Sequence, residues 1–178
     1  MLEDEELWNR IVSGDARQFS GWYQMQAPRL KIFLRHLLGS EQVAEDVMQE
    51  TFTQIWRRPA GYEAGRGSLR AWLYGAARRR AAEWRRKQKP EDAMESEPAQ
   101  ASGIERSSML ADAMARLSRE QRTLLWLREV EGHSYQELAE ILDIPLSTVR
   151  SRLHAAREAL RQLWLGSQKT KGEGYEVR

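Results

Sequence analysis

Apolar residues recur along this chain at helical spacing, most clearly in residues 134–160. Ser134 and Glu137 have the spacing of a capping box, in which each side chain bonds the other residue's backbone N–H, so a helix should begin there. Pro145 prevents simple continuation of that helix. Ser147 is a candidate cap for a second helix, whose apolar positions recur every three or four residues. The segment therefore predicts a helix-turn-helix with a buried stripe formed by Val149, Leu153, Ala156, Leu160 and Leu163.

The face opposite this stripe carries hydrogen-bond donors, most of them basic or hydroxylic. Helix-turn-helix proteins place the N-terminal half of the second helix against base edges in the major groove, while flanking cations contact phosphates. Arg150 is the first candidate for a base contact, because one guanidinium can bond two acceptors of a guanine. A purely solvated face is the alternative, but the cap, stripe, proline turn and basic face together favour a reader of duplex DNA. The candidates are Ser147, Thr148, Arg150, Ser151, Arg152, His154 and Arg157.

Elsewhere the periodicity also predicts helices, and no segment shows the alternation of a strand. Pro28 should kink or divide the second helix. Residues 59–68 form a glycine-rich loop between two helices. Side chains suited to cap helix starts are Asp15, Ser40, Ser68 and Ser118.

These elements predict an all-α chain of two small helical domains. Residues 1–88 should form the first and residues 106–165 the second, because each holds enough apolar residues for a core. Residues 89–105 contain prolines, small residues and acids without amphipathic period, which indicates a flexible acidic linker. Residues 166–178 have little to bury and should form a disordered tail.

The net charge of +2 conceals a segregation of charge along the chain. Residues 1–50 hold 5 basic and 9 acidic side chains, whereas residues 51–89 hold 11 basic and 2 acidic ones. Residues 90–105 hold 5 acidic side chains and no basic one. This asymmetry indicates a polyanionic partner for the middle segment.

Cysteine is absent, which excludes disulfides and thiolate metal sites. The acidic N-terminus does not resemble a signal peptide, and no apolar run approaches the roughly 18 residues of a membrane span. We therefore expect a cytoplasmic protein without membrane insertion.

Three segments, residues 44–58, 62–80 and 117–160, resemble the two conserved domains of bacterial RNA polymerase sigma factors of the extracytoplasmic-function (ECF) class, sigma-70 family. The resemblance covers nearly the whole chain in the right order. It implies that the first domain binds the polymerase clamp and opens the minus-ten promoter element. The second domain would contact the polymerase flap and read the minus-thirty-five element of promoter DNA, and an anti-sigma factor would be the usual regulatory partner.

The resemblance also implies site residues in the first domain. The helix after Ser40 carries the family's clamp-binding pattern on its polar side, and without the resemblance these residues would read as a solvated face. The polymerase-binding candidates are Asp46, Gln49, Glu50 and Arg57.

The loop at residues 59–68 matches the family loop that captures a flipped base, and Tyr62 aligns with its usual aromatic residue, where it would stack on the base or only anchor the loop. The following helix carries cations suited to strand backbones, whose binding should weaken steeply with salt. The minus-ten candidates are Tyr62, Arg66, Ser68, Arg70, Arg78, Arg79, Arg85 and Arg86.

This chain departs from the family pattern in several places. Arg79 and Glu83 stand where members often have Asn and Asp, so an ion pair or phosphate contact would replace a base-specific amide. Arg80 falls within the apolar stripe, where its stem should pack while its head reaches water. Ala155 replaces a position that is commonly basic, so one expected DNA contact is absent.

Catalysis finds no support in the sequence, so we expect no catalytic residue, cofactor or metal. The three histidines lie in different predicted elements, and no HExxH spacing, phosphate loop or serine elbow occurs. A carboxylate-metal nuclease built on Asp46 and Glu50 would need further acids converging in the fold. The closer alternative is a stand-alone helix-turn-helix regulator, which would bind duplex operators without polymerase.

Overall fold

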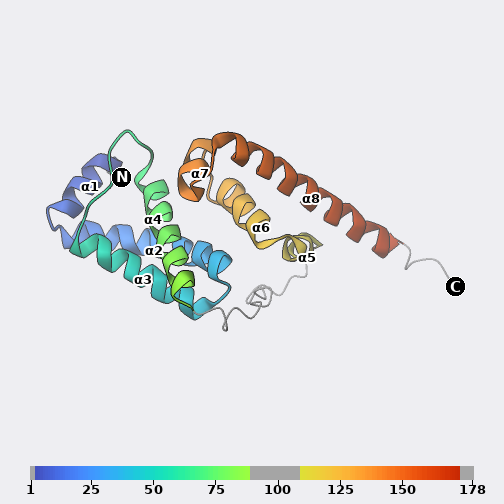
Figure 1. Cartoon of the computed structure of the whole chain (residues 1–178), viewed down its shortest axis with the longest axis horizontal. Coiled ribbons are helices and arrows are strands. Elements are labelled where there is room, and N and C mark those ends of the chain that lie inside the picture. The colour runs from blue at the N-terminus through green and yellow to red at the C-terminus, as the bar shows by residue number, and fades with distance from the viewer. Residues whose placement is uncertain (1–2, 89–108, 173–178) are drawn as a thin grey trace.

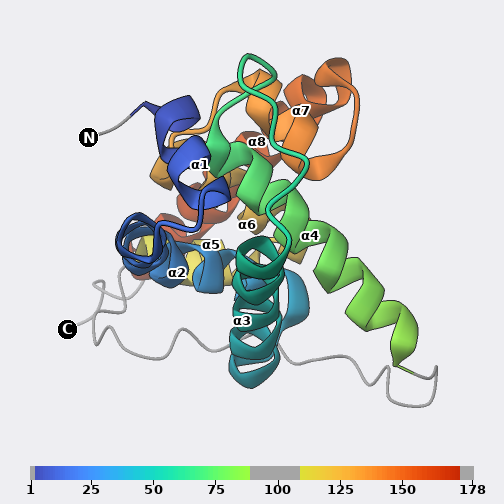
Figure 2. The same cartoon turned by 90° about the vertical axis from the view of Figure 1, so that its left-hand side faces the viewer.

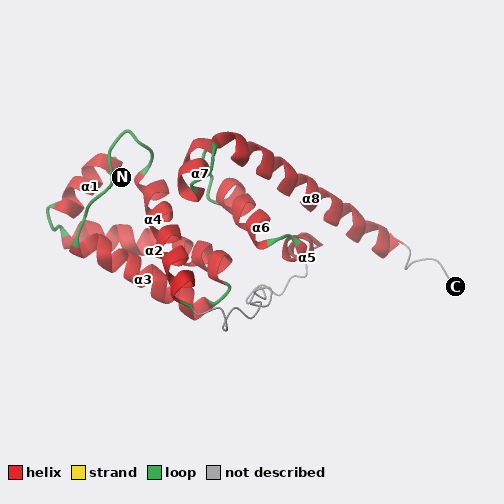
Figure 3. Cartoon of the chain, in the orientation of Figure 1, coloured by secondary structure: helices red, strands yellow, loops and turns green. Residues whose placement is uncertain are grey.

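The computed structural model describes residues 3–88 and 109–172, and every regular element in these ranges is helical (Figures 1 and 3). The first four helices form one unit, and the remaining elements, which include one π-helical turn, form the second. The elements are α1 (Asp4–Val12), α2 (Ala16–Leu38), α3 (Glu41–Arg57), α4 (Leu69–Lys87), α5 (Met109–Arg116), α6 (Arg119–Leu125), η2 (Trp126–Val130), α7 (Tyr135–Leu142) and α8 (Leu146–Gly172).

The helix starts follow the caps that the sequence predicts. Asp15 accepts from the backbone N–H groups of the first turn of α2, and Ser40 and Ser68 do the same for α3 and α4. Ser118 and Ser134 complete capping boxes at α6 and α7. Each cap satisfies backbone donors that a helix leaves unpaired, so local chemistry sets these five boundaries.

Two boundary predictions are wrong, those for Ser147 and for the tail, and one of the two alternatives for Pro28 is excluded. Ser147 does not cap α8, because that helix already begins at Leu146 and the Pro145 carbonyl accepts the first hydrogen bond from Val149 N at 3.1 Å. Pro28 does not divide α2, whose packing against α3, α4 and α6 holds it as one helix. The tail does not begin at residue 166, because α8 continues to Gly172. Residues 89–105, the expected linker, and the chain after Gly172 lie outside the described residues.

The two units pack against each other, which the sequence did not predict. In Figure 2, α4 runs beside α7, and α2 also contacts α6. The Tyr74 ring of α4 lies fully buried between the units, with its centroid 6.5 Å from that of Trp126 and 5.1 Å from that of His133. Buried apolar side chains therefore form one continuous core across both units.

Two histidines at this contact make its stability depend on pH. His36 of α2 faces Trp126 with ring centroids 5.5 Å apart, and His133 is fully buried beside Tyr74. Burial, reinforced by neighbouring arginines, lowers the pKa of each to about 4. The unfolded chain, with ordinary histidine pKa values near 6.5, therefore binds more protons than the folded chain between pH 6.5 and 4.

Stability should consequently be full above pH 6.5 and fall as the pH decreases toward 4, by up to about 1.4 kcal/mol per pH unit for each histidine. Urea unfolding at pH 7.5, 6.5 and 5.5 measures the slope, and histidine Cε1 resonances identify the groups. A free energy of unfolding that stays constant over this range would contradict the buried neutral state of both rings.

Candidate nucleic-acid interface

Helices α7 and α8 form the helix-turn-helix that the sequence predicts. The turn is made by Asp143, whose φ of 53° is left-handed, a conformation that Asp and Asn adopt more readily than most residues. Leu138 and Ile141 of α7 are fully buried, as are Val149 and Leu153 of α8. The apolar stripe thus packs inward and leaves the opposite face of α8 exposed.

The exposed face of α8 carries Ser147, Arg150, Ser151 and His154. Arg150 forms no ion pair with any residue of the described ranges, so its guanidinium is free to bind a ligand. Ser151 Oγ donates to the Thr148 carbonyl at 3.0 Å, and Thr148 is half-buried. The structure therefore brings the predicted base-reading side chains together on one accessible surface.

Arg152 and Arg157 belong to the flanks of this surface. Arg152 pairs with Glu120 of α6. Arg157 contacts Glu129 of η2 at 2.7 Å and donates to the Tyr135 hydroxyl at 3.2 Å. These contacts fix α8 on the elements below it, so a phosphate contact by either arginine would compete with an internal ion pair.

The loop before α4 is built around an aromatic cluster. The Tyr62 ring lies edge-on to Trp8 and Trp72, with centroid distances of 5.7 and 6.1 Å, and its hydroxyl donates to the Gly67 carbonyl at 3.4 Å. Gly67 has a φ of 124°, which favours glycine. This geometry supports a role for Tyr62 as an anchor of the loop, because its ring contacts two tryptophans and its hydroxyl bonds the loop backbone.

A cavity of about 330 Å³ opens beside this loop. It brings together four of the minus-ten candidates, Tyr62, Arg66, Ser68 and Arg79, from two segments of the chain. It also contains the carboxylate of Glu140, which comes from α7 in the other unit. Its wall also includes Glu63, which pairs with Arg66 at 3.0 Å, so two carboxylates and two guanidinium groups face this cavity.

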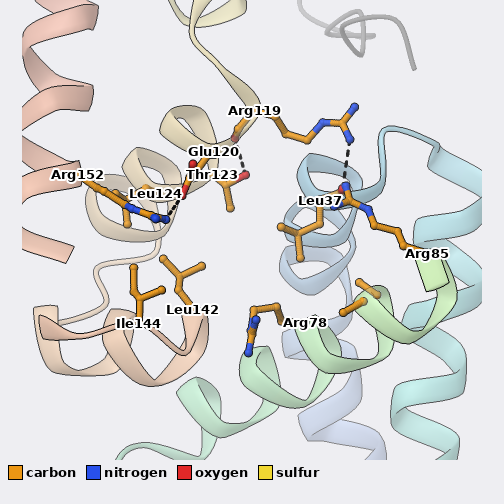
Figure 4. A pocket seen from close by; sticks show the side chains of 12 residues that line it. Leu37, Arg78, Arg85, Arg119, Glu120, Thr123, Leu124, Leu142, Ile144 and Arg152 are labelled. Carbon is orange, nitrogen blue, oxygen red and sulfur yellow. Dashed lines mark hydrogen bonds and ion pairs between the residues drawn. The ribbon is translucent and has the colours of Figure 1, made fainter. Parts of the chain in front are cut away.

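The cations of α4 point to more than one side of the helix. Arg78 and Arg85 line a second cavity, of about 670 Å³, between the two units (Figure 4). Arg70 lies beside the buried carboxylate of Glu131, 3.7 Å away. Arg79 faces the loop cavity, and Arg86 is exposed near the end of α4.

The polymerase-binding candidates lie together on α3. Exposed side chains opposite the buried apolar residues supply all four candidates, Asp46, Gln49, Glu50 and Arg57. The Glu50 carboxylate accepts a hydrogen bond from the Arg80 guanidinium of α4 at 3.0 Å. The charged end of Arg80 therefore lies at the surface beside α3. The α3 surface is thus a mixed-charge strip held rigidly against α4.

Sequence reasoning missed four carboxylates of the second unit that contact residues of the first. Glu131 is buried, and its carboxylate accepts from the Tyr74 hydroxyl at 3.1 Å. Glu137 and Glu140 lie three residues apart on α7, a spacing that places them on one face, and Asp143 follows at the C-cap of the helix. The sequence shows the spacing of these acidic residues, but it does not show which residues of the first unit they contact. Trp8, which supports Tyr62, was missed because α1 lies far from the loop in sequence.

Across residues 3–88 and 109–172, no three histidine, aspartate or glutamate side chains are grouped so that they could hold a metal ion. Over the same ranges, no helix has the length and apolar character to cross a membrane.

Comparison with known proteins identifies both units. The family described as sigma-70 region 2 matches residues 22–91, and sigma-70 region 4 matches residues 107–160. The chain is 31% identical over 157 residues to the ECF RNA polymerase sigma factor RpoE of Cereibacter sphaeroides, covering 83% of this chain and 87% of that protein. It is 32% identical over 160 residues to the ECF RNA polymerase sigma factor SigL of Mycobacterium tuberculosis, covering 84% and 90%.

A solved structure shares the arrangement. The sigma factor RpoE from Bartonella quintana, co-crystallised with the anti-sigma factor NepR, superposes with a TM-score of 0.65 at 29% identity. The match covers 83% of this chain and 97% of that one, so it extends over both helical units.

Proposed function

Because this chain belongs to the ECF sigma factors of the sigma-70 family, we propose that it binds core RNA polymerase and directs the enzyme to promoters whose duplex it reads and opens. The observation that carries this proposal is the presence of both conserved regions in their family order, each on its own helical unit. The protein acts by binding, as other sigma factors do, and works in the cytoplasm, where the polymerase is. An anti-sigma factor is its expected regulator, as for the similar protein from Bartonella quintana.

Reading of the minus-thirty-five element is assigned to the outer face of α8. Arg150, Ser147, Ser151 and His154 lie there, and the N-terminal half of a recognition helix is the part that reaches base edges. Arg150 has the strongest case, because a free guanidinium can bond O6 and N7 of one guanine. Thr148, Arg152 and Arg157 would contact the flanking backbone.

Opening of the minus-ten element is assigned to the loop cavity and to α4. Removing a base from the stack costs a few kcal/mol, and stacking on an aromatic side chain returns about 1–3 kcal/mol, so polar contacts must supply the rest. Arg66, Ser68 and Arg79 line the cavity and can supply them. Arg70, Arg78, Arg85 and Arg86 would hold the strand backbone.

Replacing Tyr62 tests the loop. Tyr62→Ala removes the ring that fixes the loop between Trp8 and Trp72, so we expect promoter opening to fall about 10-fold or more while duplex binding by α8 is retained. Tyr62→Phe is the matched control, because it keeps the ring and loses only the long hydrogen bond to Gly67. Permanganate reactivity of promoter thymines measures opening, and equal reactivity in both variants would remove Tyr62 from this role.

The rival function is a stand-alone helix-turn-helix regulator. This function would explain the region 4 match at residues 107–160, but it would not explain the region 2 match at residues 22–91. Mixing the purified protein with core polymerase and separating the mixture by gel filtration distinguishes the two. We expect a stable complex that binds promoter fragments far more tightly than the protein alone, whereas a regulator would bind equally well with or without the polymerase.

A further inference from the structure

We propose that the larger cavity between the two units is a binding site for a small organic anion that carries a carboxylate or phosphate head on an apolar body. The cavity has a volume of about 670 Å³, which lies within the range of about 300–1,000 Å³ that small-molecule sites occupy. The site is distinct from the loop cavity and from the outer face of α8, so the proposal goes beyond promoter recognition.

Both units contribute apolar walls to this cavity. The apolar side chains come from the first unit at Leu37, Ala81 and Ala82, and from the second unit at Leu124, Leu142 and Ile144. Leu37, Leu142 and Ile144 are only half-buried, so part of their apolar surface faces water. Covering that surface with the apolar body of a ligand is favourable, because it removes apolar area from water.

Four guanidinium groups also line the cavity, and two of them already have carboxylate partners. Arg78 of α4 donates to Asp143 at 3.2 Å. Arg152 of α8 pairs with Glu120 of α6. These two ion pairs neutralise their own parts of the wall, so neither arginine requires a ligand.

The other two guanidinium groups, those of Arg85 and Arg119, form no ion pair with any residue in the part of the chain that the structure describes. Arg119 donates only to the Leu37 carbonyl, at 3.4 Å. Partial desolvation, reinforced by the nearby Arg119 cation, lowers the pKa of Arg85. An anion between the two guanidinium groups would offset their repulsion and supply the missing counter-charge.

The cavity therefore has a cationic end and an apolar end. In Figure 4, the side chains of Arg85 and Arg119 reach the neighbourhood of Leu37. Leu142 and Ile144 lie on the opposite side of the cavity. Guanidinium groups match the oxygen spacing of carboxylates and phosphates. The anionic head should lie between Arg85 and Arg119, with the apolar body directed toward Leu142 and Ile144.

A ligand in this position would contact both units at once, because each unit supplies one of the two arginines and half of the apolar wall. Arg85 is also a candidate for holding the strand backbone at the minus-ten element. An occupied site would thus withdraw one cation from promoter opening, and this consequence alone rests on the proposed function.

Titrating the protein, without polymerase, with octanoate and with octyl phosphate tests the site. Both probes carry an anionic head on a short alkyl body, and together they distinguish a carboxylate from a phosphate. Octanol lacks the charge, and inorganic phosphate lacks the apolar body. Calorimetry measures Kd, and the methyl resonances of Leu142 and Ile144 locate the bound probe. We expect the better of the two anions to bind about tenfold or more tightly than octanol or inorganic phosphate, because hydrogen bonds to charged groups are the strong ones.

Replacing Arg119 tests the cationic end. Arg119→Gln removes the charge but keeps an amide that can donate to the Leu37 carbonyl, and Arg119 belongs to none of the promoter or polymerase assignments. Arg17→Gln is the matched control, because Arg17 is an exposed cation on α2 that does not line the cavity. Affinity for the better anion should fall about three- to fivefold in Arg119→Gln, as expected for an exposed charge contact, and stay unchanged in the control.

Ala82→Trp tests the apolar wall. Ala82 is exposed where it lines the cavity, so the larger ring can fill the space without displacing core residues. Thermal unfolding checks that the variant folds, and we expect binding of both anions to be lost. Anion binding that is unchanged in this variant would place the ligand elsewhere and overturn the proposal.

Three further results would overturn the proposal. The first is octanol binding as tightly as the anions, and the second is an equal loss of affinity in Arg119→Gln and Arg17→Gln. The third is anion binding that appears only after the acids of residues 90–105 are replaced by amides, because those acids would then be the occupant of the cavity. Every titration uses the protein alone, so a failure of the proposed sigma activity would show separately, as absence of initiation with core polymerase.

Discussion

The double variant Asp46→Arg, Gln49→Arg should lose affinity for core RNA polymerase by about a hundredfold or more. Both side chains reach solvent on the polar side of α3, and truncating or reversing a charged group buried at an interface typically costs about 2–5 kcal/mol. Folding should be unaffected, because neither residue is fully buried and the arginine introduced at position 49 can pair with Glu45, which Gln49 now contacts at 2.9 Å.

The matched control is Glu6→Arg with Asn9→Arg on α1. It makes the same change in charge at the same spacing on another exposed helix. Fluorescence anisotropy with labelled protein and purified core measures the affinity, and thermal unfolding checks that both variants fold. If the control loses as much affinity as the α3 variant, binding responds to net charge and α3 is not the contact surface.

Arg150→Ala should change which promoters the polymerase selects. A bidentate arginine contact discriminates between bases by about 1–3 kcal/mol, so the preference at one position of the minus-thirty-five element should fall roughly 5- to 150-fold. Arg161→Ala is the control on the same helix, because Arg161 pairs with Glu158 and lies beyond the N-terminal half of α8.

Selection of binding sites from a randomised promoter library, with core polymerase present, reads out this preference position by position. Relaxed preference at a single position is the expected result. A uniform loss of affinity for all sequences would instead assign Arg150 to a phosphate, and the base contact to another residue of the outer face.

Local features of the fold were predictable from the sequence because their causes are local. Ser134 and Glu137 form their capping box through neighbouring backbone groups, and the stripe on α8 follows from helical periodicity alone. The prediction that Ser147 caps α8 was wrong because Pro145, two residues earlier, sets the start of that helix. Whether Pro28 divides its helix was not predictable, because that depends on how the rest of α2 packs against its neighbours.

The contact between the units was not predictable in the same way. Tyr74 lies in the apolar part of its own helix, and nothing near it in sequence indicates that its ring contacts Trp126 and His133. The contacts of Glu137 and Asp143 across the units were not predictable, because their partners Ser68 and Arg78 lie more than sixty residues away. Which surfaces pack together depends on the complementary shape and charge of the two folded units.

This contact also gives the site an asymmetry. The surface assigned to duplex reading, around Arg150, is exposed, whereas the cavity assigned to base capture contains the Glu140 carboxylate of the other unit. The polymerase-binding candidates lie on α3, away from α7 (Figure 2).

The most direct test of the account is initiation itself. Purified core RNA polymerase, with and without this protein, should transcribe fragments of the genome of the source bacterium, and sequencing of the RNA 5′ ends maps the starts. We predict a defined set of starts that appears only with the protein and shares two sequence elements about two duplex turns apart. Start sites that are the same with and without the protein would contradict the account.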